Sequence, residues 1–184
     1  MRKLTRFRLT FAVALLAAVA LMQSFRARAA TASIGDSEQL SDLLTQVKWE
    51  ALELRNDAEK MDSFTRSGNS WMSFATKVNE IREHVNKTGK LIAQLTEARD
   101  TGSPWQQQAI DHILPALKEL AANTTLTIDH LNNNKNVIHN EALQRYCGVN
   151  YELARELVAL ITDFMDYGET EAKFADLQRK VGSH

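Results

Sequence analysis

A repeat of apolar residues between positions 71 and 95 constrains the fold of this 184-residue chain more than any other feature. Apolar or small side chains recur there in alternating steps of three and four residues: Trp71, Phe74, Val78, Ile81, Val85, Thr88, Ile92 and Leu95. This spacing is typical of a helix that packs one seam against partner helices. Because a helix cannot bury such a seam alone, the repeat predicts further helices around a shared core.

Three other segments carry similar repeats, over residues 40–61, 110–131 and 142–167. Short polar turns separate the four segments, and the clearest is Thr101-Gly102-Ser103-Pro104. Short connections place consecutive helices antiparallel and side by side. We therefore predict an all-α, up-down-up-down four-helix bundle with helices at about 37–63, 70–100, 103–132 and 137–167.

Three single residues refine this prediction. Asp36 is expected to cap the first helix, because its carboxylate can accept the unpaired N–H groups of the first turn. Gly89 lies inside the second helix, where glycine costs about 1 kcal/mol relative to alanine, so we expect a bulky neighbour against its backbone. Gly168 is expected to end the fourth helix, and residues 170–181 are expected to form a short additional C-terminal helix.

The first 29 residues have the layout of a bacterial-type secretory signal peptide. A basic start precedes an apolar run over residues 9–22, and Ala27-Arg28-Ala29 is a small-x-small cleavage site. The run is shorter than the ~20 residues that a membrane-spanning helix needs. We predict that residues 1–29 are cleaved and that residues 30–184 form one domain, periplasmic or extracellular, with no stable membrane span.

Signal removal would change the charge of the chain. Six of the 22 Lys and Arg residues precede residue 30, whereas none of the 23 Asp and Glu residues do. The remaining chain would carry 16 basic and 23 acidic side chains, a formal charge of −7. Nucleic-acid binding requires a basic face, so this balance argues against a nucleic-acid partner.

The motifs that carry catalysis or covalent cofactors are missing from the sequence. It has no Gly-x-Ser-x-Gly elbow, no phosphate-binding glycine loop, no Cys-x-x-Cys-His and no paired Glu-x-x-His. Glu80 and His84 are four residues apart, a spacing more typical of a surface contact than of a zinc site. Cys147 is the only cysteine, and its place on a helical stripe predicts burial. We therefore predict no catalytic residues, no enzyme and no metal site.

The leading hypothesis is an exported, non-enzymatic bundle of binding, adaptor or sensor-like type, without a cofactor, whose partner is a protein or an envelope component. In the alternative, the bundle binds haem b or copper at one end, with Met61 or Met72 and His130 or His139 as ligands, since methionine and histidine suit haem iron and soft metals. A third hypothesis is a homodimer joined through apolar residues of the segment 170–181. The three tryptophans are expected to close the core, unless one forms an exposed patch for a partner.

Overall fold

The computed structural model describes residues 35–136 and 139–182, and all regular structure within them is helical. The elements are α2 (Glu38–Phe64), α3 (Trp71–Ala98), a short 3-10 turn η1 (Arg99–Thr101), α4 (Pro104–Asn133) and α5 (Glu141–Gly182). No strand occurs in this part of the chain. The all-α prediction is confirmed, whereas the predicted signal peptide lies outside the described residues.

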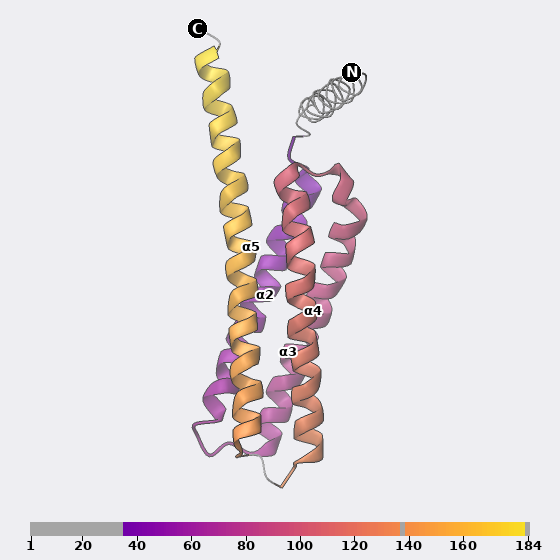
Figure 1. Ribbon diagram of the computed structural model, residues 1–184, viewed down its shortest axis with the longest axis vertical. Coiled ribbons are helices and arrows are strands. Elements are labelled where there is room, and N and C mark those ends of the chain that lie inside the picture. Colours follow the sequence, from indigo (N-terminus) through magenta and orange to yellow (C-terminus); the bar gives the residue numbers. More distant parts are fainter. Residues whose placement is uncertain (1–34, 137–138, 183–184) are drawn as a thin grey trace, which may run out of the picture. The chain divides into compact units, whose positions relative to one another are not determined.

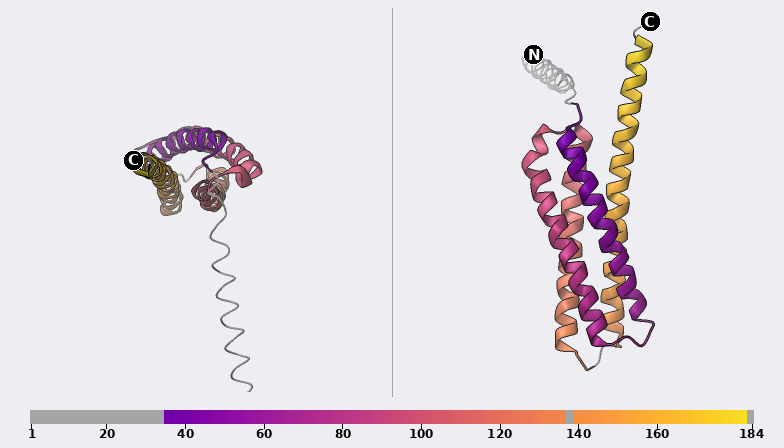
Figure 2. Two further views of the ribbon diagram at one scale, coloured as in Figure 1. Left: turned by 90° about the horizontal axis from the view of Figure 1, so that it is seen from above. Right: turned by 180° about the vertical axis from the view of Figure 1, so that it is seen from behind.

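The four helices pack in a ring, in which each helix contacts two others (Figures 1 and 2). Helix α2 packs against α3 and α5, and α4 packs against the same two helices from the other side. Consecutive helices run in opposite directions. This is the arrangement of an antiparallel four-helix bundle, which the short turns predict.

The repeat that predicts α3 forms part of the core. All its members from Phe74 to Leu95 are buried, including the polar Thr88. The core also contains a buried polar group between α4 and α5, where Asn150 donates to Thr127 Oγ1 at 2.9 Å and accepts from Thr124 Oγ1 at 3.2 Å. Because a buried amide requires these partners, the group favours one alignment of the two helices.

The helix ends differ in detail from the predicted ones. Ser37, not Asp36, caps α2, and its hydroxyl accepts from the Leu40 N–H at 3.4 Å. The Asp36 carboxylate instead accepts from the indole N–H of Trp105 at 2.7 Å, so it connects the α2 entry to α4. Helix α5 begins at Glu141, later than predicted, because Asn140 Oδ1 accepts from the Leu143 N–H at 2.8 Å.

Gly168 does not end the fourth helix, and the predicted break is wrong. Helix α5 runs without interruption from Glu141 to Gly182, so residues 170–181 continue it instead of forming a separate helix. Gly168 is buried against the indole of Trp105, and a Cβ on Gly168 would lie 2.4 Å from two ring atoms. The glycine therefore makes room for Trp105 and keeps an ordinary helical backbone.

The C-terminal part of α5 extends beyond the other helices (Figures 1 and 2). Helix α5 has 42 residues, whereas α2 has 27 and α4 has 30. Every residue from 169 to 182 is exposed except Asp176, which is half-buried. We call residues 169–182 the protruding end of α5.

Candidate functional site

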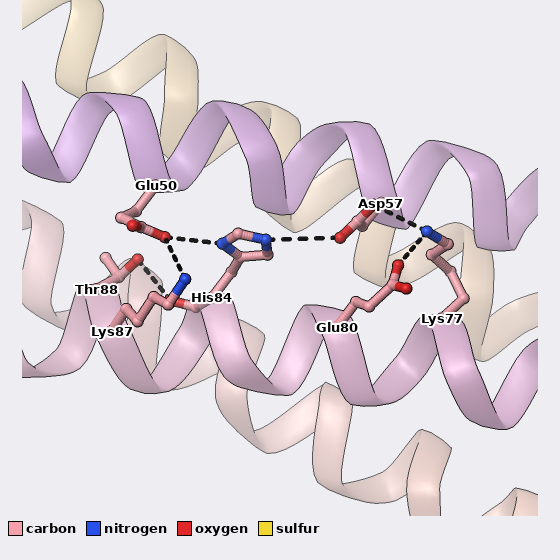
Figure 3. A network of polar contacts seen from close by, with 7 residues as sticks. All are labelled: Glu50, Asp57, Lys77, Glu80, His84, Lys87 and Thr88. Carbon is pink, nitrogen blue, oxygen red and sulfur yellow. Dashed lines mark hydrogen bonds and ion pairs between the residues drawn. The ribbon is translucent and has the colours of Figure 1, made fainter.

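The most extensive polar arrangement on the bundle lies where α2 faces α3. Glu50 and Asp57 of α2 meet Lys77, Glu80, His84 and Lys87 of α3, and Figure 3 shows these side chains together with Thr88. We call these residues the α2–α3 polar network. Its members come from corresponding levels of two antiparallel helices, so the helix packing itself brings them together.

His84 is held between two carboxylates of the other helix. Its Nδ1 lies 2.7 Å from Glu50 Oε2, and its Nε2 lies 3.7 Å from Asp57 Oδ2 (Figure 3). Lys87 Nζ is 4.0 Å from the same Glu50 oxygen. Both ring nitrogens therefore face acids within the protein, which favours a contact that joins the helices over one that reaches outward.

Lys77 joins the other half of the network. Its ammonium donates to Asp57 Oδ1 at 3.0 Å and also to Glu80 Oε2 (Figure 3). Burial opposes the charge on Lys77, but the hydrogen bonds to Glu80 and Asp57 outweigh it, so the pKa of Lys77 is raised. The pair of acids thus keeps this half-buried lysine charged.

Glu80 and His84 do not pair with each other, although their spacing of four residues indicates a contact between them. Glu80 pairs with Lys77, whereas His84 faces the acids of α2. The sequence does not indicate that Glu50 and Asp57 contact His84, because they lie on another helix. Only the register of α2 against α3 brings them to His84. Within residues 35–136 and 139–182, no three His, Cys, Asp or Glu side chains are grouped so that they could hold a metal ion.

The four candidate haem or copper ligands lie in different environments. Met61 is fully buried in the core, whereas Met72 is 64% exposed. His139 is exposed, with its ring 6.4 Å from that of Phe74. The half-buried His130 packs beside Tyr146, and its Nε2 is a buried nitrogen for which the described residues provide no hydrogen-bond partner.

Cys147 is buried, as its place on the helical stripe predicts. Burial raises the pKa of its thiol to about 12, and the nearby Asp62 carboxylate contributes to the rise. Because the thiolate is the reactive form of cysteine, this environment disfavours chemistry at the sulfur atom at neutral pH.

Two of the three tryptophans close the core, and the third is exposed. Trp105 is buried at one end of the bundle, and Trp71 is half-buried at the other end, where its indole N–H donates to the Leu131 carbonyl at 2.9 Å. Both close the core at their levels, whereas Trp49 is exposed on α2. Trp49 therefore does not close the core.

A surface groove of about 600 Å³ runs between α3 and α4, with an apolar floor that includes Val85, Leu114 and Leu117. Gly89 borders this groove, and a Cβ on Gly89 would meet nothing within 4 Å. The predicted bulky neighbour of Gly89 is therefore wrong. Among the described residues, no contact explains this glycine.

Among the described residues, α5 carries the largest group of exposed apolar side chains on a single helix, and three of them lie on its protruding end. Phe174 is 61% exposed, Leu177 is 58% exposed and Val181 is 75% exposed. With the exposed Tyr167 they recur at steps of seven, three and four residues, so they line one face of the helix. We call these four residues the α5 stripe.

No protein family, curated protein or solved structure matches this chain. Among the described residues, no helix combines the length and the hydropathy needed to cross a bilayer. Any function proposed for the chain therefore depends on its own residues.

Proposed function

We propose that the chain is an exported, non-enzymatic binding protein of adaptor type, which contacts its partner through the protruding end of α5. The observation that carries this proposal is the α5 stripe, which exposes Tyr167, Phe174, Leu177 and Val181 on one helical face. Single exposed apolar residues are common on protein surfaces, whereas apolar residues grouped on one face are typical of an interaction site.

The weak internal support of the protruding end favours a docking role. Its ion pairs are surface pairs along the helix, such as Lys173 with Glu169 and Lys180 with Asp176. Pairs at this spacing contribute only about 0.2–0.5 kcal/mol each. A helix of this length is marginal in water on its own, and here it is nucleated only by the packed part of α5 that precedes it. A partner that covers the α5 stripe would supply the missing stabilisation.

The rest of the molecule supports binding more than catalysis. The polar network uses His84 to join α2 and α3, and burial makes Cys147 unreactive at neutral pH. Export to the periplasm or cell exterior is proposed from the signal-peptide pattern of residues 1–29. The partner would accordingly be a protein of the cell envelope or the exterior.

Site-specific photo-crosslinking in the producing cell tests this proposal. A photoreactive phenylalanine analogue at position 174 should form covalent adducts with a protein partner. The same analogue at Leu126, a 52% exposed residue of α4, is the matched control and should form few. Adducts absent at position 174, or equally abundant at both positions, would contradict docking through α5. Amino-terminal sequencing of the mature chain tests export, since a chain that begins at Met1 would contradict it.

The haem or copper alternative is favoured by one observation, the buried Nε2 of His130 without a hydrogen-bond partner in the described residues. His130 would then be the histidine ligand, with Met61 or Met72 as the methionine ligand. Purified protein from cells supplied with haem or copper should then show a Soret band or bound copper. Loss of that signal in His130→Ala would support the alternative, and a colourless, metal-free wild-type protein would reject it.

A further inference from the structure

The charges beside the α5 stripe indicate what covers it. Seven-residue spacing places Asp166, Lys173 and Lys180 along one flank of the stripe, and Glu171 with Gln178 along the other. Acidic and basic residues are separated along the helix, because Asp166 and Glu171 lie near the bundle whereas Lys180 lies near the C-terminal tip. A partner helix that matches this pattern must carry a base beside Asp166 and an acid beside Lys180.

A second copy of the same helix meets this requirement only when it runs antiparallel. In an antiparallel pair, like flanks face each other, so Asp166 lies beside the partner's Lys180 and the reverse contact repeats by symmetry. Lys173 then lies near its own symmetry mate, but it is paired with Glu169 within its own helix, and the two attractive pairs outnumber this one repulsive contact. In a parallel pair, Asp166 would instead lie beside the partner's Glu171, and two acids would repel. We propose that two copies of the chain pair through their protruding ends in an antiparallel, two-fold arrangement. This inference rests on the proposed docking role of α5 and names its partner.

The same alignment covers the apolar residues. With the two-fold axis near Phe174, Tyr167 of one copy lies level with the partner's Val181, and Phe174 lies beside its symmetry mate. The two bundles then lie at opposite ends of the paired segment. Lys180 is paired with Asp176 within its own helix, and exposed pairs of this kind rearrange at little cost.

The size of the contact predicts how strong the pairing is. The 14 residues of the protruding end span about 20 Å at ~1.5 Å per residue. Four turns of helix offer less area than the ~800 Å² per partner of a stable interface. The dimer is therefore weak and depends on concentration, with monomers at low micromolar and dimers at millimolar concentration.

Sedimentation velocity of the purified, cell-processed chain over this concentration range tests the pairing. Wild type should shift from monomer to dimer, and Phe174→Ala with Leu177→Ala should remain monomeric, since alanine keeps the helix but removes the stripe. Leu126→Ala, at an exposed apolar position outside the stripe, should dimerise as wild type does. A wild-type chain that stays monomeric at millimolar concentration, or a dimer that survives both alanine substitutions, would overturn the proposal.

Charge reversal tests the antiparallel direction. Asp166→Lys and Lys180→Glu should each weaken dimerisation by about tenfold at low salt, because each replaces two attractive pairs by two repulsive ones. The double variant, or a mixture of the two single variants, should restore it. Parallel pairing would instead be strengthened by Asp166→Lys, so that result would overturn the antiparallel arrangement.

The crosslinking experiment separates the two proposals. Adducts of position 174 with the chain itself support self-pairing. Adducts only with another protein, together with a monomeric wild-type chain, would overturn self-pairing and leave the docking role standing. An absence of adducts at position 174 would overturn both.

Discussion

At the scale of single residues, two glycines inside helices face opposite surroundings. Gly168 lies against the Trp105 ring, where a Cβ would come within 2.4 Å of two ring atoms. Gly89 borders the α3–α4 groove, where a Cβ would meet nothing within 4 Å. Both are glycines in the middle of helices, so only their neighbours distinguish their roles.

Alanine substitution at the two positions should change stability in opposite directions. Gly89→Ala should raise the free energy of unfolding by about 1 kcal/mol, because alanine is the better helix former. Gly168→Ala should lower it by about 1–3 kcal/mol, because the indole of Trp105 must move. Urea unfolding of the three proteins measures both changes. Equal stabilisation by the two substitutions would show that Trp105 does not pack on Gly168.

Cys147 provides a second prediction at this scale. Since its pKa is raised from 9.0 to about 12, its stabilising contribution is complete below pH 9.0 and is lost as the pH rises towards 12. Relative to Cys147→Ala, the wild type should lose at most about 1.4 kcal/mol of unfolding free energy per pH unit in that window. The native thiol should also resist alkylation at pH 8 and react after unfolding. Rapid alkylation of the folded protein would contradict the buried position.

Residue identity alone did not distinguish these environments. Met61 and Met72 are the same residue type at the same end of the bundle, yet Met61 is buried and Met72 is exposed. The sequence alone indicates that a helix ends at Gly168, because glycine is common at helix ends. The ring that requires this glycine belongs to Trp105, far away in the sequence, so no local pattern could indicate it.

At the scale of helices, the α2–α3 polar network sets the contact between two neighbours. Its acids on α2 and its bases on α3 are far apart in sequence. Their pairing can therefore be predicted only when the alignment of the two helices is known. The apolar repeats predicted which faces meet, and they therefore predicted the helices well. They did not predict that Asp57 would be shared by Lys77 and His84.

Removal of the Lys77 charge should weaken this helix contact. Lys77→Met keeps the apolar stem but leaves Asp57 and Glu80 without their shared cation, which should cost about 1 kcal/mol of unfolding free energy. Because the pKa of Lys77 is raised above 10.5, its contribution is complete below pH 10.5 and is lost as the pH rises through the raised value. The difference between the two proteins should therefore narrow in that alkaline range.

Lys87→Met is the matched control for this prediction. Lys87 lies on the same helix and in the same network, but its side chain is exposed and its Nζ is 4.0 Å from Glu50 Oε2. Its substitution should change the free energy of unfolding by less than about 0.5 kcal/mol. Similar losses in the two variants, measured by urea unfolding at neutral pH, would contradict the special role of Lys77.

At the scale of the whole molecule, the bundle and the protruding end have different requirements. The bundle buries its four apolar seams within one chain, whereas the protruding end leaves the α5 stripe exposed. The sequence indicated apolar residues in this segment but placed them on a separate short helix. The predicted ends of the other three helices lie within about two residues of the observed ones, so the error is the predicted break at Gly168. Because α5 instead continues past the ends of its neighbours, the stripe has no partner inside the chain.

Hydrogen exchange of the backbone amides along α5 tests whether the protruding end lacks a partner within its own chain. In dilute monomer, amides of residues 169–182 should exchange much faster than those of residues 147–161, whose side chains pack in the core. At concentrations that favour pairing, or with a docked partner, protection should extend into the protruding end and leave the bundle unchanged. Strong protection of residues 169–182 in dilute monomer would show instead that the α5 stripe is already covered within one chain, and it would rule out the proposed docking role.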